Sequence, residues 1–386
     1  MTRSPFPLVV AAVMLAAANA CQGDVIDEHL AVIAMVGRQA AGSAEAREAC
    51  DALAEQDAAV LPRLLAAMQT SNPVAANWYR TAYEALVARE IGNPQPTFPV
   101  TELRAVLLDS KNSGRVRRLV LALCEQLEPG FTATFIPARL DDPEFRADAV
   151  DAALATAQTA LENGDSETAR GLLRQAFEHA RTSDQVVRAA GKLTVLGEPA
   201  DVVTHLGLVI DWWLIGPFDA PQFSGFKQVF PPEQGVDLQA EYAGQNGRTL
   251  RWTRHRTDDP LGLVNLVQAL APATEAVGYA YAELEAPRDM AAQLRCGADD
   301  NCAVWLNGQQ VFAREQWLNG VRFDRFSAPV QLQKGKNLLL VKIGQGPQHK
   351  NPDVANDWSL YVRFCDEAGT GVGLRSLLPP ISKEQR

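Results

Sequence analysis

The hydrophobic pattern of this 386-residue chain changes its period near residue 207. From Val25 to about Leu206, apolar residues recur every three or four positions, and clusters of Pro, Gly, Asn and Asp interrupt the pattern. This spacing predicts helices joined by short turns. After Gly207, short runs rich in Trp, Phe, Gly and Asn alternate apolar with polar residues, which predicts β-strands. We therefore expect an all-α first half and an antiparallel β second half.

The helical half repeats a local arrangement. Segments that begin at Ser71, Asp109, Leu140 and Thr182 each place a turn before an amphipathic stretch that contains arginine. Such recurrence at intervals of about thirty to forty-five residues predicts a solenoid of stacked helical repeats.

One of these segments, LDDPEFRADAVDAAL (140–154), resembles the second helix of a HEAT repeat. The resemblance implies that Leu140, Phe145, Ala149 and Ala153 are core positions. It also implies that the repeats bind a protein partner along one face. Pro143 fits the first turn of such a helix, because no amide donor is needed there.

The sequence pattern after Gly207 predicts one β-sandwich of short strands, because nine candidate strands fall within about 180 residues. Residues 294–308 are expected to form a hairpin around Asp299-Asp300-Asn301, with a second turn at Asn307-Gly308. The candidate strands are 208–215, 249–254, 277–285, 291–296, 302–307, 309–313, 328–333, 337–344 and 357–364.

The runs Trp305–Val311 and Lys334–Lys342 are similar to the jelly-roll domain of family 2 glycoside hydrolases and to galactose-binding-like modules. The matching residues make turns and packing contacts, so this resemblance implies a fold and no catalytic site. The run DWWLIGPFDAPQFSGF (211–226), together with the helical half, resembles exported planctomycete-type proteins that join HEAT-like repeats to one such sandwich. That group implies an architecture and no activity.

The expected organisation is therefore a signal peptide (1–20), a HEAT-like α-helical domain (21–206), a galactose-binding-like β-sandwich (207–375) and a C-terminal tail (376–386). The signal peptide is indicated by Arg3, the apolar run Leu8–Ala18 and the small residue Ala20. The apolar run is about eleven residues long, too short to span a bilayer, and no later segment is long enough.

Cleavage after Ala20 would make Cys21 the first residue of the mature chain. Ala18 and Asn19 depart from the usual lipobox, so ordinary cleavage and lipidation of Cys21 both stay open. The protein is expected to be exported, as a periplasmic protein, a cell-envelope lipoprotein or a secreted protein. A net charge of −10 argues against a nucleic-acid partner, since such surfaces need clustered Lys and Arg.

Two cysteines of the predicted hairpin, Cys296 and Cys302, lie symmetrically about Asp299. In paired strands their side chains could face each other, so a disulfide is one prediction. Two buried thiols are the alternative.

The acidic turn between these cysteines is a candidate ligand site. Asp299 and Asp300 resemble the paired aspartates of protective-antigen-like lectin domains, which implies bound Ca²⁺, and Asn301 could add a third oxygen ligand. The alternative is an ordinary tight turn, which prefers the same residues.

Exposed aromatic rings would offer platforms for sugar rings. Trp212, Trp213, Trp317 and Trp358 are candidates, at least half are expected to be packing residues, and Trp317 is the one expected to be exposed. The polar loop 345–357 would add His349 and Asn356 to a binding site, unless it is an irregular surface loop.

The sequence contains no recognisable catalytic motif. We therefore expect a noncatalytic exported protein that binds a glycan or cell-envelope polysaccharide through the sandwich, with the helical repeats as a platform. The first alternative is an envelope scaffold that binds a protein partner and no sugar. The second is a glycoside-acting enzyme or enzyme accessory, whose carboxylates would face each other across a cleft.

Overall fold

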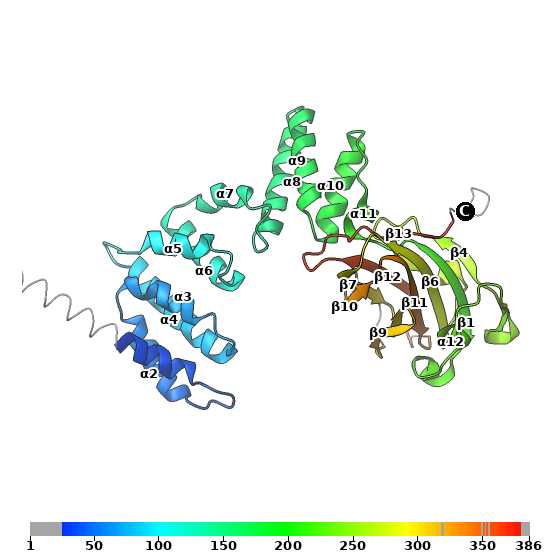
Figure 1. The fold of residues 1–386 in the computed structure, drawn as a ribbon. Helices are drawn as coiled ribbons and strands as arrows, with labels where there is room; N and C mark the ends of the chain where they lie inside the picture. The colour runs from blue at the N-terminus through cyan, green and yellow to red at the C-terminus, as the bar shows by residue number, and fades with distance from the viewer. Residues whose placement is uncertain (1–24, 318–319, 349, 352, 354–355, 380–386) are drawn as a thin grey trace, which may run out of the picture. The chain divides into compact units, whose positions relative to one another are not determined.

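The computed structural model describes residues 25–317, 320–348, 350–351, 353 and 356–379 (Figure 1). The predictions for the signal peptide, for Cys21 and for His349 lie outside the described residues. The chain divides into two compact units, residues 1–138 and 139–386. Helices dominate up to residue 206, and antiparallel sheets follow, so the predicted combination of α and β structure is confirmed.

The first unit is helical throughout its described part. Its helices pack through small and aromatic residues: the α4 helix buries Ala75, Tyr79 and Tyr83, and the Tyr79 hydroxyl donates to the carbonyl of Leu30 at 2.6 Å. After residues 25–34, which are also helical, the elements are α2 (Ser43–Ala54), η1 (Ala58–Val60), α3 (Leu61–Ala67), α4 (Pro73–Ile91), α5 (Val100–Leu108), α6 (Gly114–Leu127), α7 (Phe131–Phe135) and η2 (Ile136–Ala138).

The second unit begins with four helices, three of which have a side-chain cap at their start. The side chains of Asp165, Thr182 and Asp201 each accept a hydrogen bond from a backbone amide of the first turn, as expected for N-cap residues. The helices are α8 (Arg146–Glu162), α9 (Ser166–His179), α10 (Ser183–Val195) and α11 (Val202–Leu206). Their core includes Leu208 and Ile210, so the helices and the start of the β region share one cluster.

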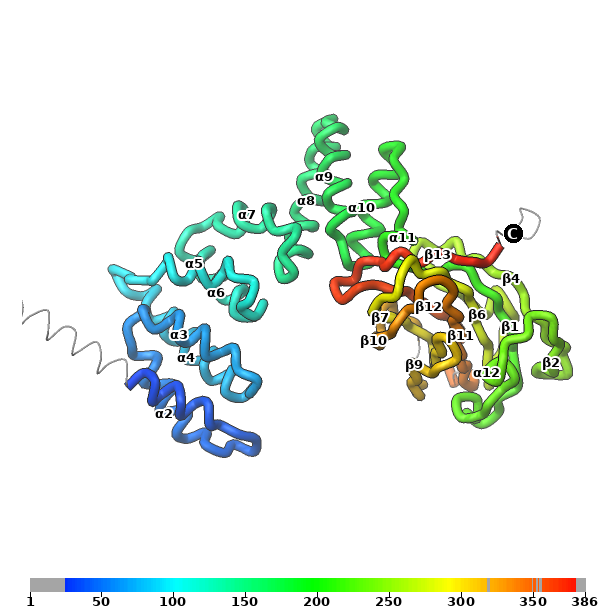
Figure 2. The backbone as a smooth tube through the Cα atoms, viewed as in Figure 1, coloured from blue at the N-terminus to red at the C-terminus, as the bar shows by residue number. Residues whose placement is uncertain are grey.

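All strand pairings of the second unit are antiparallel (Figures 1 and 2). A seven-stranded sheet has the order β4 (Thr253–Arg256), β1 (Asp211–Asp219), β6 (Ala276–Ala286), β11 (Gly335–Gln345), β8 (Cys302–Leu306) and β9 (Gln309–Arg314), and β13 (Arg375–Ser376) also pairs with β6. A four-stranded sheet has the order β10 (Phe326–Leu332), β7 (Met290–Ala298), β12 (Ser359–Cys365) and β5 (Val264–Asn265). The smallest sheet pairs β2 (Tyr242–Ala243) with β3 (Thr249–Leu250). Short helical turns are η3 (Pro221–Phe226), α12 (Pro231–Gln234), η4 (Gln245–Gly247) and α13 (Leu266–Ala269).

The predicted hairpin around Asp299-Asp300-Asn301, within residues 294–308, is wrong, because β7 and β8 belong to different sheets. Asp299–Asn301 carries the chain from one sheet to the other, and the apolar residues of both strands then face one shared core. The next turn is a hairpin as predicted: β8 pairs with β9 across Asn307 and Gly308, which both have positive φ.

The two larger sheets pack around a core made of alternate residues. On β6, Ala280, Ala282 and Leu284 belong to the cluster between the sheets, whereas Tyr279 and Tyr281 belong to a separate cluster on the other side of the sheet. This is the two-residue period of a strand with both faces covered. Among the described residues, no helix has the length and apolar character that a membrane span requires.

Candidate functional site

Four residues come together where β11 ends, and we call them the tip site: Phe223, Asp300, Trp317 and Gly346. The rings of Phe223 and Trp317 meet edge to face with centroids 4.4 Å apart. The Gly346 amide donates to Oδ2 of Asp300 at 2.6 Å. Trp317 is 37% exposed and Phe223 is 46% exposed, so the pair offers aromatic surface to a ligand.

Glycine at position 346 lets the tryptophan lie directly on backbone. A Cβ built there would lie 2.9 Å from Oδ2 of Asp300 and 3.2 Å from the Trp317 ring. Any larger residue would therefore push the ring and the carboxylate apart.

The turn that carries Phe223 has an unusual backbone. Gln222 and Phe223 have φ values of 57° and 60°, a left-handed conformation that is uncommon for residues other than glycine. Glu275 holds the turn: its carboxylate accepts from the Gln222 amide at 2.8 Å, and its backbone carbonyl accepts from Ala220 at 2.8 Å. The Glu275 amide in turn donates to the carbonyl of Gly346 at 2.9 Å. Costly backbone geometry of this kind is typical of functional sites.

The segment Asp299–Asn301, which we call the acidic crossover, adjoins the tip site through Asp300. Oδ1 of Asp299 accepts from the amides of Asp300 at 3.1 Å and Gly320 at 3.2 Å. Asp299 is only 4% exposed, and burial, together with the negative charge of Asp300, raises its pKa to about 6.

Two buried amides lie next to this crossover. Asn301 packs against Gly344, where a Cβ would come within 2.0 Å of its Oδ1. Nδ2 of Asn301 and Nε2 of Gln345 are buried donors without a hydrogen-bond partner among the described residues. An unsatisfied buried donor costs free energy, so each of these two groups is a site where a buried water would bind.

The structure brings together three of the predicted site residues, Asp299, Asp300 and Trp317. Asn356 lies on a neighbouring loop, where its Nδ2 donates to the carbonyl of Ala273 at 3.2 Å. The prediction that Trp317 is the exposed tryptophan agrees with its exposure.

Trp358 is not a surface platform, and its predicted place in a ligand site is wrong. Its side chain is 1% exposed and belongs to the core between the sheets. A Cβ at Gly278 would lie 2.7 Å from the indole, so the ring occupies space that this glycine leaves. Trp212 is also fully buried, and Trp213 is half-buried with the Arg254 guanidinium 5.3 Å from its ring.

The described residues contain no group of three or more His, Cys, Asp or Glu side chains arranged to hold a metal ion. At the crossover, oxygens of Asp299 and Asp300 already accept backbone amides. Asn301, the predicted third Ca²⁺ ligand, is buried against Gly344.

Cys296 and Cys302 are two buried thiols and form no disulfide in this structure. They lie on β7 and β8, in opposite sheets, so the paired-strand geometry behind the disulfide prediction is absent. The neighbouring thiol of Cys302 and burial together raise the pKa of Cys296 well above its usual value.

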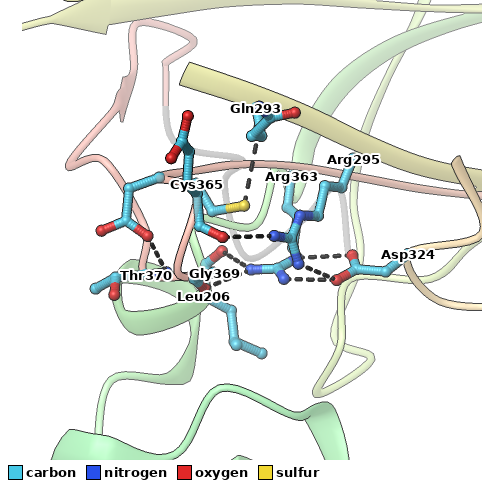
Figure 3. Close-up of polar contacts among 10 residues, drawn as sticks. Leu206, Gln293, Arg295, Asp324, Arg363, Cys365, Gly369 and Thr370 are labelled. Atoms are coloured by element: carbon cyan, nitrogen blue, oxygen red, sulfur yellow. Dashed lines mark hydrogen bonds and ion pairs between the residues drawn. The ribbon is translucent and has the colours of Figure 1, made fainter. Parts of the chain in front are cut away.

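A cluster of hydrogen bonds and ion pairs around Arg363 and Asp324 (Figure 3) anchors the segment that follows Trp317. Arg363, 1% exposed on β12, makes two hydrogen bonds to the Asp324 carboxylate at 2.7 and 2.6 Å. It also donates to the carbonyls of Leu206 and Gly369, both at 2.9 Å, and Arg295 adds a bond to Asp324 at 3.1 Å. Asp324 lies seven residues after Trp317. Through Arg363 it is linked to Leu206 at the end of α11.

A groove of about 860 Å³ lies on the other side of the 221–226 turn. Its walls include Phe218, Asp219, Ser224, Phe230 and Tyr242. No sequence pattern predicts this groove or the roles of Phe223 and Glu275, because they come together only through the left-handed turn and the pairing of Asp219 with Ala276.

One wall of the groove rests on a buried ionic network. Lys342 on β11 donates to Glu233 at 2.8 Å and to the carbonyl of Gln228 at 2.6 Å, and the Tyr279 hydroxyl donates to the same Glu233 oxygen at 2.5 Å. Burial lowers the pKa of Lys342. The network fixes residues 226–234 to the outer face of the seven-stranded sheet.

No protein-family model and no curated protein matches the chain. Among solved structures, a family 35 carbohydrate-binding module from an environmental isolate is 14% identical, with 28% of this chain and 78% of the module aligned at a TM-score of 0.21. A family 2 glycosyl hydrolase from Bacteroides cellulosilyticus is 14% identical at a TM-score of 0.24, with 42% of this chain and 20% of the enzyme aligned. A Ruminococcus gnavus β-glucuronidase is 12% identical at 0.25, with 42% and 28% aligned.

The chain thus spans most of the binding module but less than a third of either of these two enzymes. At these TM-scores the similarities define no family, and any functional argument depends on the geometry of the tip site.

Proposed function

We propose that this protein binds glycans without cleaving them and that the tip site is where a sugar ring stacks. The observation that carries the proposal is the exposed Trp317–Phe223 pair beside the Asp300 carboxylate. The apolar face of a pyranose covers an aromatic ring while its hydroxyls bond to nearby carboxylates and amides. A carboxylate has about four acceptor positions, so Asp300 can bond to a hydroxyl as well as to Gly346.

The proposal includes a named fold for each part of the chain. The helices before residue 207 would be HEAT-like repeats that serve as a platform, and the two larger sheets would form a galactose-binding-like jelly roll. We further propose that the protein is exported, as its N-terminal sequence indicates, and that its target is an extracellular or cell-envelope polysaccharide.

The burial of the acidic crossover supports a noncatalytic role. Asp299 has a raised pKa, which would suit a general acid, but it is 4% exposed and accepts two backbone amides. Glycosidases need two carboxylates on either side of a bond in an open cleft. Asp299 and Asp300 are sequence neighbours whose oxygens bond to backbone instead.

The test is a glycan array probed with the full-length protein, with and without a calcium chelator. We expect saturable binding that Trp317→Ala weakens at least about tenfold and Phe223→Ala weakens less. Leu338→Ala is the matched control, since Leu338 is 38% exposed and lies near the opposite end of β11. Silence on every glycan would overturn the proposal, and release of sugar would overturn its noncatalytic part. A loss with chelator would revive Ca²⁺ at Asp299, Asp300 and Asn301.

A protein partner is the second candidate, and one observation favours it. Val25, Val32 and Met35 lie at the start of the first unit with 41%, 38% and 83% of their surfaces exposed. Val25 and Val32, seven residues apart, lie on one stripe of the helix 25–34, and Met35 is in the turn that directly follows it. Such a stripe fits a scaffold that recruits another protein, and the array separates this role from the first.

A further inference from the structure

The groove and the tip site share one piece of backbone. Pro221, Gln222 and Ser224 line the groove, whereas the ring of Phe223, between them, contacts Trp317. The left-handed conformation at Gln222 and Phe223 sends adjacent side chains to the two sides of the turn. A ligand that leaves the Trp317 ring can therefore pass over a single turn and reach the groove.

The lining of the groove mixes aromatic edges with oxygen acceptors. Phe218, Phe230 and Tyr242 supply apolar surface, and the rings of Phe218 and Tyr242 lie 6.1 Å apart. Asp219, exposed at the end of β1, accepts one long bond of 3.4 Å from Gln245 and keeps capacity to accept others. Ser224 adds a hydroxyl. A few fixed polar groups in a partly aromatic wall are typical of small-molecule sites, and about 860 Å³ is within their usual range.

The charge of the lining limits the kind of ligand. Asp219 and Glu241 contribute carboxylates, and no Lys or Arg occurs among the described residues that line the groove. Arg251 forms an ion pair with Glu241, so the positive charge of Arg251 is already matched. An acidic sugar would bring its carboxylate towards Asp219 without a cation to meet it, and the two negative charges would repel each other.

We propose that the groove is a second subsite for the same glycan, so that the protein reads an extended, uncharged chain of several sugars and disfavours acidic ones. This inference rests on the proposed function of the tip site. One end of the chain stacks on Trp317 and Phe223, and following units lie against Tyr242 and hydrogen bond to Asp219. The ionic network of Lys342 and Glu233 keeps the far wall in place for them.

The experiment measures affinity against chain length by isothermal titration of the full-length protein. The probes are xylo- and gluco-oligosaccharides of about one to six units, and oligogalacturonides of the same lengths as the acidic counterpart. Wild-type affinity should rise by about tenfold or more between the shortest and longest uncharged chains, a gain of about 1.4 kcal/mol. The acidic ladder should bind more weakly at every length.

Variants separate the groove from the tip. Tyr242→Ala and Asp219→Ala should each reduce the gain with length and leave the affinity for the shortest binding sugar unchanged, whereas Trp317→Ala should weaken every length. Leu338→Ala should alter neither. Affinity independent of length, equal binding of the acidic ladder, or an unchanged length dependence in both groove variants would overturn the second subsite while the tip site stands. Failure of the wild type to bind any of these probes would overturn the second subsite, and silence on every glycan of the array as well would overturn the tip site.

Discussion

The two faces of the seven-stranded sheet use the same strands for different purposes. On β11, Leu339, Val341 and Ile343 face the core between the sheets, whereas Lys342 faces outward. The inner face is closed by another sheet, and a large cluster of buried apolar side chains lies between the two sheets. The outer face is covered by residues 220–252, where aromatic rings surround the bonds among Lys342, Glu233 and Tyr279.

This difference shows where the molecule can hold a ligand. An apolar interior packed by two sheets leaves little room and few polar groups, and its role is stability. The outer cover is built from turns and short segments that need charged and aromatic anchors, and the groove opens between them. The inner face should therefore control folding, and the outer face and tip should control binding.

The largest effect is expected on the inner face. Trp358→Ala should lower the free energy of unfolding by about 3–5 kcal/mol, because it leaves a cavity in a well-packed core. Trp213→Ala, on the half-buried outer side, is the matched control and should cost clearly less. Urea unfolding followed by circular dichroism measures both. Equal costs would mean that the two faces do not differ as described.

The outer face is tested through its ionic network. Lys342→Met should cost about 3 kcal/mol, since it leaves the Glu233 carboxylate under the cover without its cation. The double variant Lys342→Met with Glu233→Gln should recover part of that loss, because no unpaired charge remains. The double-mutant cycle reports the coupling. Strictly additive losses would show that the pair does not act as a unit.

The pH dependence of stability tests the buried carboxylate of Asp299, which lies next to the tip site. The pKa of Asp299 is raised to about 6 from 3.8, so the folded state holds this proton more tightly than the unfolded state. The resulting stability is complete below about pH 4 and is lost as the pH rises through about 6, a change on the order of 3 kcal/mol.

Asp299→Asn should therefore stabilise the protein relative to wild type at about pH 7.5 and not at about pH 4. Unfolding titrations at the two pH values measure the difference. Glu367→Gln, an exposed carboxylate in the same unit, controls for the general effect of removing a charge. An identical gain at both pH values would contradict the raised pKa.

The smallest effect on stability is expected at the ring itself. Trp317→Ala should change the free energy of unfolding by less than about 1 kcal/mol, because the side chain is over a third exposed. Glycan binding should nevertheless weaken at least about tenfold. A large drop in stability would instead identify Trp317 as a packing residue.

The sequence predicted where strands and turns occur more successfully than which strands pair with each other. Asn307-Gly308 predicts the β8–β9 hairpin because its turn chemistry is local. The Asp299–Asn301 segment was misread, because a short acidic link can turn a hairpin or cross between sheets, and both place Cys296 and Cys302 in an apolar core. The choice depends on which distant strands pair with β7 and β8.

The exposure of the aromatic side chains could likewise be predicted only where it depends on nearby residues. Trp317 lies between strands in a polar segment, so its exposure could be predicted. Trp358 has similar polar neighbours, but Gly278, eighty residues earlier, provides the space that buries it. Phe223 and the groove depend on backbone angles at Gln222 and on the Glu275 carboxylate that holds them, neither of which leaves a periodic signal.

The most direct measurement is a crystal structure of the full-length protein soaked with xylohexaose and, in parallel, with cellohexaose. We predict sugar density stacked on Trp317 and Phe223 that continues past Ser224 towards Tyr242. Density bound elsewhere on the second unit, or an empty tip site at saturating concentrations of both chains, would contradict it.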